Sequence, residues 1–273
     1  MTRTPDLFRN QILVAPVAGL LLLAGCATPS GPNGNTAQVQ APVDDRPAQR
    51  LQAPAGFHAP AASKARFEGC PEMSTPHTGP LDFPSKYQGS DSARDDLNEQ
   101  AEARYREQVD GIRDLERGIS RLVEAYLDTA DPQAVSCALD WMLEWARLGG
   151  LTGEVTTHTG KSVRKWALGS VAAAYLRLKL SVSDPLKPYP DQAAEIEDWL
   201  AELATLVIAD WSNVPQRKFN NHEYWAAWSV MAVAVVRDDR SLFDWAVAQY
   251  DRAAQFGVIF MREPELMEYL GRR

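Results

Sequence analysis

Residues 224–236 read Tyr-Trp-Ala-Ala-Trp-Ser-Val-Met-Ala-Val-Ala-Val-Val, a stretch without one charged side chain. A helix built from it is apolar on every side, so it must be covered by neighbours all round. The stretch therefore predicts a central helix inside an all-α body.

Apolar residues elsewhere in the body also recur at helical spacing, and alternating strand patterns are almost absent. Caps and breakers predict helices at residues 91–128, 132–148, 160–180, 190–211, 221–236 and 240–255. Six helices are too few to surround the central one. Either a partner covers it, or further helices expected of the fold are missing.

The N-terminus has the pattern of a bacterial export signal. Arg3 and Arg9 precede an apolar run, Ile12 to Gly25, that is short for a membrane span. The run ends in Leu23-Ala24-Gly25-Cys26, which resembles a lipobox. We expect residues 1–25 to be removed and Cys26 to carry acyl chains that anchor the protein in the periplasm, at the outer membrane. An ordinary cysteine behind a simple signal peptide is the alternative.

Residues 26–66 are rich in Ala, Pro, Gln and Gly, with Phe57 as their only aromatic side chain. This composition predicts a flexible tether, which as a coil would hold the body on the order of 35 Å from the membrane. The helical domain is expected at residues 67–255, followed by a tail at residues 256–273.

The chain contains three cysteines. Lipidation of Cys26 would leave Cys70 and Cys137 as a pair. A disulfide between them would stabilise the fold by about 4 kcal/mol in the chain-entropy model. Two separate buried thiols are the alternative.

A formal net charge of −8 argues against a nucleic-acid partner, so an anionic ligand would need a local basic patch. None of the four histidines has a second one at the i, i+4 spacing, and no cysteine pair lies nearby. Gly160-Lys161-Ser162 lacks the spacing of a phosphate-binding loop. We therefore expect neither a metal nor a cofactor.

Two segments could carry chemistry. Thr157 to Trp166 begins a helix with Lys161, Arg164 and Lys165 on its first turns, where cations oppose the helix dipole unless an anion binds there. A solvated basic face is the alternative. In Asn220-Asn221-His222, one Asn can cap the central helix while the other Asn and the imidazole face a cleft. Alone, a histidine at a helix start is most often structural.

Five blocks taken together resemble the periplasmic alginate lyases of polysaccharide lyase family five, over residues 68–254. They are Ser85 to Arg94, Cys137 to Met142, His158 to Ser170, Asn220 to Met231 and Leu242 to Val247. The resemblance implies an incomplete (α/α) toroid of helical hairpins, of which this chain holds the N-terminal half to two thirds. It also implies cleavage of β-1,4-linked mannuronate by β-elimination, which leaves 4,5-unsaturated uronate ends.

The resemblance also implies roles for individual residues. Asn221 would neutralise the uronate carboxylate, and His222 would be the base or its partner. The substrate path would be lined by Ser85, Lys86, Tyr87, His158, Thr159, Lys161, Arg164, Trp166, Asn220 and Trp225. A basic strip for an anionic polysaccharide would comprise Lys86, Lys161, Arg164, Lys165, Arg217 and Lys218.

The family's catalytic Tyr and a supporting Arg would follow Asp244-Trp245, but the tail does not match and Tyr269 does not map onto that Tyr. The chain is therefore expected to be C-terminally truncated. Three functions follow: an alginate lyase, a non-catalytic alginate-binding envelope lipoprotein that could contact an alginate export or assembly complex, or a helical interaction lipoprotein.

Overall fold

The structure is a computed structural model that describes residues 50–63, 66–87, 98–215 and 220–257. The predicted signal peptide, Cys26, Arg217, Lys218 and residues 258–273 lie outside these ranges. Within them, no helix is long and apolar enough to cross a membrane.

The described body is all-helical, which confirms the predicted fold class. Its helices are α1 (Glu99–Thr129), α2 (Pro132–Arg147), α3 (His158–Lys179), α4 (Pro190–Trp211), α5 (Asn221–Arg237) and α6 (Arg240–Gly257), preceded by the 3-10 turn η1 (Ala55–His58). Five of the six predicted helices agree within two residues at both ends. The first begins at Glu99 rather than near residue 91, because the Asn98 side chain accepts a hydrogen bond from Ala101 N and caps α1 there.

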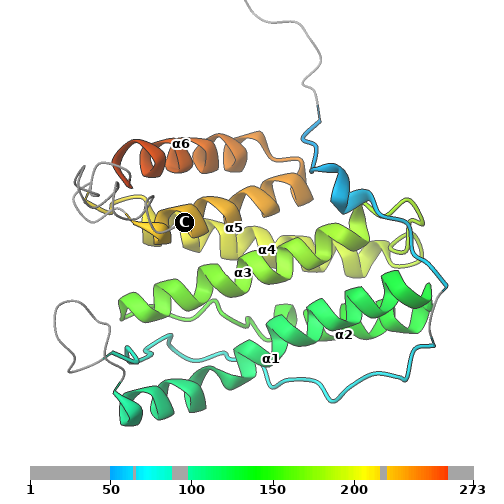
Figure 1. Ribbon diagram of the computed structural model, residues 1–273, viewed down its shortest axis with the longest axis horizontal. Coiled ribbons are helices and arrows are strands. Elements are labelled where there is room, and N and C mark those ends of the chain that lie inside the picture. The colour runs from blue at the N-terminus through cyan, green and yellow to red at the C-terminus, as the bar shows by residue number, and fades with distance from the viewer. Residues whose placement is uncertain (1–49, 64–65, 88–97, 216–219, 258–273) are drawn as a thin grey trace, which may run out of the picture. The chain divides into compact units, whose positions relative to one another are not determined.

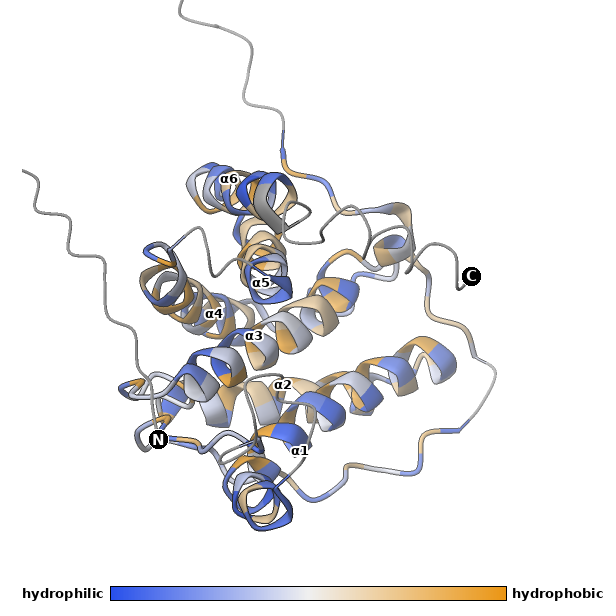
Figure 2. Cartoon of the chain, turned by 60° about the vertical axis from the view of Figure 1, so that its left-hand side comes forward, coloured by the Kyte–Doolittle hydropathy of each residue, from blue (hydrophilic) through white to orange (hydrophobic). Residues whose placement is uncertain are grey.

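The helices form three consecutive hairpins, α1–α2, α3–α4 and α5–α6 (Figure 1). α3 is central, since it packs against α1, α4 and α5, and α5 in turn packs against α3, α4 and α6. Figure 2 shows hydrophilic and hydrophobic residues alternating around α1 and α2, as expected of helices with one solvated side.

The central helix predicted from residues 224–236 is covered on most of its surface but not all round. Ala226, Val230 and Val233 are fully buried, whereas Trp225 and Trp228 are 48% and 40% exposed. The expectation of neighbours on every side is therefore met within the described body only where α3, α4 and α6 lie.

An extended segment, residues 66–87, runs beside the loop before α3. Leu81 N donates to Glu154 O (2.7 Å), and Leu81 forms an isolated parallel bridge with Val155. Gly160 lets the segment approach α3, because a Cβ at this position would lie 2.0 Å from Leu81 O. Thr157 caps α3 by accepting from Gly160 N and donates to Phe83 O, both at 3.0 Å. These contacts carry the next residues, Ser85 to Tyr87, over the start of α3.

Residues 50–63 lie in the predicted tether, yet they contact the body. Ala62 N donates to Leu127 O (2.7 Å), and Ser181 Oγ donates to Ala59 O (3.2 Å). Phe57 packs against the core. A few apolar contacts and hydrogen bonds therefore hold this part of the predicted tether against the body.

Cys70 and Cys137 are joined by a disulfide, with their Cα atoms 5.7 Å apart. The pairing is the one predicted, and it ties the extended segment to α2.

Candidate active site

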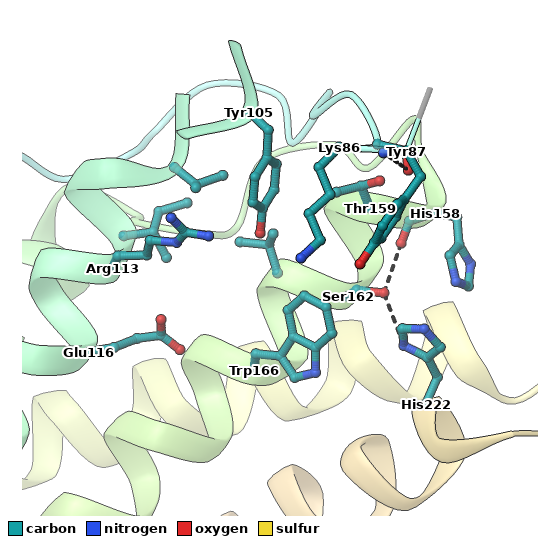
Figure 3. Close-up of a pocket in the computed structure, with 14 residues that line it drawn as sticks. Lys86, Tyr87, Tyr105, Arg113, Glu116, His158, Thr159, Ser162, Trp166 and His222 are labelled. Atoms are coloured by element: carbon teal, nitrogen blue, oxygen red, sulfur yellow. Dashed lines mark hydrogen bonds between the residues drawn. The ribbon is translucent and has the colours of Figure 1, made fainter. Parts of the chain in front are cut away.

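A pocket of about 530 Å³ lies where the extended segment crosses the starts of α3 and α5, with α1 forming its far wall. Figure 3 shows the side chains of Lys86 and Tyr87 extending into it from the segment, opposite Trp166 and His222. Its lining residues are Ser85, Lys86, Tyr87, Tyr105, Val109, Ile112, Arg113, Glu116, His158, Thr159, Ser162, Val163, Trp166 and His222.

Seven of the predicted site residues meet in this pocket. They are Ser85, Lys86, Tyr87, His158, Thr159, Trp166 and His222. They come from three segments that are far apart in the sequence, and the fold alone brings them together.

The His222 ring is held between aromatic rings. It stacks on Trp211 (centroids 5.6 Å apart, 16°) and on Trp166 (5.8 Å, 29°). His158 meets it edge-on at 5.0 Å. Because Trp211 is buried, the imidazole has a fixed plane at the floor of the pocket.

Two polar groups on α3 lie against Nδ1 of His222. Lys165 Nζ is 2.8 Å from it, and Ser162 Oγ is 3.3 Å from it. Lys165 is fully buried, with its Nζ 3.4 Å from the centroid of the Trp211 ring. Burial lowers the pKa of Lys165 to about 6, against the opposing effect of the Glu223 carboxylate.

The two asparagines at the start of α5 have different positions. Asn220 is the cap: its Oδ1 accepts from His222 N (2.8 Å), and Glu223 accepts from Asn220 N (2.7 Å) in a capping box. The side-chain oxygen of Asn220 thus orders the helix start, and its predicted substrate contact stays a prediction. Asn221 is exposed beside His222 and does not line the pocket; its role as carboxylate neutraliser stays a prediction.

Two members of the predicted basic strip, Arg164 and Lys165, are corrected because they are buried. Arg164 is 3% exposed and pairs with Asp210 (2.8 Å), and it donates to the Leu151 and Gly153 carbonyls. Burial lowers its pKa. Lys161 Nζ donates to Asp210 O (3.3 Å). Arg164 thus lies in the interior, Lys161 is partly exposed at the α3–α4 contact, and neither lines the pocket.

Trp225 was predicted to contact substrate, but it lies exposed on α5 away from the pocket lining.

Sequence reasoning missed three residues of α1, namely Tyr105, Arg113 and Glu116. Arg113 Cζ lies 5.1 Å from the centroid of the Tyr105 ring, and Glu116 accepts from Ser170 Oγ (3.1 Å). Burial raises the pKa of Glu116. Their spacing in the sequence could have indicated them, because at helical spacing these polar residues share a helix face with the apolar Val109 and Ile112. Among the residues that line the pocket, Arg113 and Lys86 are the ones with arginine and lysine side chains.

No group of three His, Cys, Asp or Glu side chains in the described parts of the chain is placed to hold a metal ion. The chemistry that the pocket residues offer is acid–base and electrostatic.

Solved structures show the same fold. A Tyr-to-Phe variant of alginate lyase A1-III complexed with tetrasaccharide matches with a TM-score of 0.59 at 20% sequence identity, covering 74% of this chain and 54% of that one. The crystal structure of alginate lyase A1-III from Sphingomonas species A1 matches with a TM-score of 0.57 over the same shares. The helical hairpins therefore define a protein of the α/α toroid class.

Residues 82–260, more than half of the chain, match the family model described as alginate lyase. The chain is 51% identical over 205 residues to the alginate lyase of Pseudomonas aeruginosa and 49% identical over 208 residues to that of Azotobacter vinelandii. These matches cover 75% and 76% of this chain. The chain belongs to the alginate lyase family. It spans about half the length of these relatives, 56% in both cases.

Proposed function

We propose that this protein depolymerises alginate by β-elimination at β-1,4-linked mannuronate. The single observation that carries the proposal is His222, fixed by Trp166 and Trp211 at the floor of a pocket that also holds Lys86 and Arg113. Family membership supplies the substrate class. The export pattern of residues 1–26 supports a periplasmic, lipid-anchored location.

The reaction moves one proton off C5 and one onto O4. Lys86 and Arg113 offset the charge of the uronate carboxylate, which makes the C5 proton more acidic. His222 takes that proton, the C5–H electron pair forms the C4=C5 double bond, and the C4–O4 bond breaks. The base must be a neutral imidazole with a lone pair toward the substrate.

The departing O4 requires a proton donor. Within the described residues, the tyrosines that line the pocket are Tyr87 and Tyr105. Tyr105 is 8% exposed and packs beside Arg113, whereas Tyr87 is half-buried on the segment above His222. We assign the donor role to Tyr87.

The proposal is tested by incubating the full chain with polymannuronate and following the ultraviolet absorbance of unsaturated uronate ends. His222→Ala should abolish the signal. His58→Ala is the matched control, because His58 is an exposed histidine on η1, outside the pocket lining. A fully active His222→Ala variant would refute the assignment of the base.

The second candidate is an alginate-binding envelope protein that cuts nothing and meets an alginate export or assembly complex. The cations and aromatic rings of the pocket favour binding whether or not a proton donor is in place. Retained affinity for alginate without any absorbance signal would support this candidate over the lyase.

A further inference from the structure

Lys165 is a fully buried lysine that the elimination does not use directly. Its amine lies in the aromatic cluster beneath the pocket, 3.4 Å from the Trp211 centroid and 5.7 Å from the Trp166 centroid. It does not line the pocket, but it reaches Nδ1 of His222 at 2.8 Å. It can therefore act on the substrate only through His222.

Ser162 influences whether Nδ1 of His222 carries the ring proton. A hydroxyl has one hydrogen, and Ser162 Oγ donates it to His158 O at 3.0 Å. Toward Nδ1 of His222, 3.3 Å away, the hydroxyl oxygen can then only accept. Ser162 thus favours the tautomer with the proton on Nδ1.

The charge of Lys165 decides whether it favours the same tautomer of His222 as Ser162 does or the other one. A neutral amine has a lone pair that can accept Nδ1–H, whereas an ammonium has only donors and requires the lone pair at Nδ1. The second arrangement moves the ring proton of a neutral imidazole to Nε2. A ring with its proton on Nε2 cannot take a proton through that atom.

We propose that Lys165 is a positioning residue that selects the tautomer of His222, keeping the ring proton on Nδ1 when the amine is neutral and moving it to Nε2 when the amine is charged. The catalytic meaning of this selection rests on the proposed lyase function. The tautomer itself is a property of the resting protein and can be measured without substrate.

The surrounding charges are consistent with a neutral amine at pH 7. From α5, the buried Glu223 carboxylate favours the ammonium, but burial outweighs it and brings the pKa of Lys165 to about 6. On α3, the ring of His158 lies edge-on to that of His222, with their centroids 5.0 Å apart. From α4, Asp210 is engaged by Arg164 at 2.8 Å and by the more distant Lys161.

The test is long-range ¹H–¹⁵N NMR of the histidine side chains of the full chain, titrated from pH 8 to pH 5. The four histidines give few signals, and His222→Gln identifies that of His222. We expect the Nδ1–H tautomer at pH 8 and a neutral Nε2–H form appearing as the pH falls below about 6. An Nε2–H tautomer at pH 8, or direct conversion to the imidazolium, would overturn the inference.

Lys165→Met removes the amine and keeps the apolar stem, and Lys187→Met is the control because Lys187 is exposed in the loop between α3 and α4. In Lys165→Met, His222 should hold the Nδ1–H tautomer until it becomes imidazolium. The acid limb of lyase activity should move about half a pH unit or more toward acid, since one of two coupled proton acceptors is gone. An unchanged limb together with an unchanged tautomer titration would refute the role.

The two hypotheses fail separately. If the wild-type protein forms no unsaturated products, the proposed function fails while the NMR titration still decides the inference. If Lys165→Met does not fold, the wild-type titration, which requires no substitution at position 165, still decides it.

Discussion

Lys165 affects folding as well as the tautomer of His222. Its pKa in the folded protein is about 6, against an ordinary value of 10.5. Between these pH values the unfolded chain binds a proton at this side chain that the folded chain does not. The free energy of unfolding should therefore rise with pH across that window.

Lys165→Met should remove this pH dependence. Near pH 7 the variant should be more stable than the wild type by on the order of a few kcal/mol, and the difference should shrink toward pH 10. Urea denaturation at pH 6.5 and pH 9.5 measures both, with Lys187→Met as the control. Equal pH dependence in the variant and the wild type would show that the buried amine stays charged.

The proposed proton donor, Tyr87, can be distinguished from Tyr105 by substitution. Tyr87→Phe should lower kcat by about 100-fold or more with little change in KM, because general acid catalysis is lost while the ring remains. Tyr105→Phe, buried beside Arg113, should have a smaller effect. Steady-state kinetics on polymannuronate compares them, and the reverse ranking would assign the donor to Tyr105.

Sequence could identify some of these residues and not others, for a physical reason. His222 and Trp166 stood in blocks whose order carried the family resemblance. Lys165 was placed on a surface strip, because a run of basic residues does not tell which of them faces the interior. The partner that settles Arg164 is Asp210, 46 residues away and on another helix.

Among the secondary-structure elements, helix positions were predictable because their signals are local, such as Asp131-Pro132 at the start of α2 and Asn220 before α5. The residues of α1 that form the far wall of the pocket could not be predicted in this way. Arg113 and Glu116 become pocket residues only when residues 85–87 fold across α1 and α3, and that crossing depends on long-range contacts such as Leu81 with Val155.

A substitution at Gly160 tests how closely the extended segment must approach α3. A Cβ there would lie 2.0 Å from the Leu81 carbonyl oxygen, so Gly160→Ala must push the extended segment away from α3. We expect a loss of about 1–3 kcal/mol in the free energy of unfolding, accompanied by reduced activity because Lys86 and Tyr87 move with the segment. Gly56→Ala is the control, since nothing lies within 4 Å of its added Cβ. Equal stability of the two variants in urea would show that the crossing is loose.

The Arg164–Asp210 pair joins α3 to α4 in the interior. Asp210→Asn would leave a buried guanidinium without its counter-charge, which should cost about 3–5 kcal/mol. Glu195→Gln removes the partner of Arg147 in an exposed pair and should change stability little. Thermal unfolding of both variants distinguishes them, and similar melting temperatures would count against a structural role for Arg164.

The molecule as a whole is acidic, yet its proposed ligand, alginate, is also an anion. The net charge of −8 disfavours approach of such a ligand at long range, so binding depends on Lys86 and Arg113 at short range. Salt screens both effects, yet contacts within the pocket are screened less than the long-range repulsion. Trp225 and Trp228 are exposed on α5. The sequence raised two ways of covering this helix, a partner or further helices, and both stay predictions.

The disulfide is the covalent link across this fold. It joins the extended segment to α2 and closes a loop with a sequence separation of 67 residues, so its reduction removes the covalent restraint between them. In the chain-entropy model such a loop contributes about 4 kcal/mol. Replacing Cys70 and Cys137 by Ser should lower the urea midpoint accordingly, and a reducing agent should destabilise the wild type but not the variant. Because Leu81 and Thr157 still hold the segment near the pocket, the folded variant should keep most of its activity at low temperature. A variant that stays fully stable yet inactive would instead show that the disulfide orders the site directly.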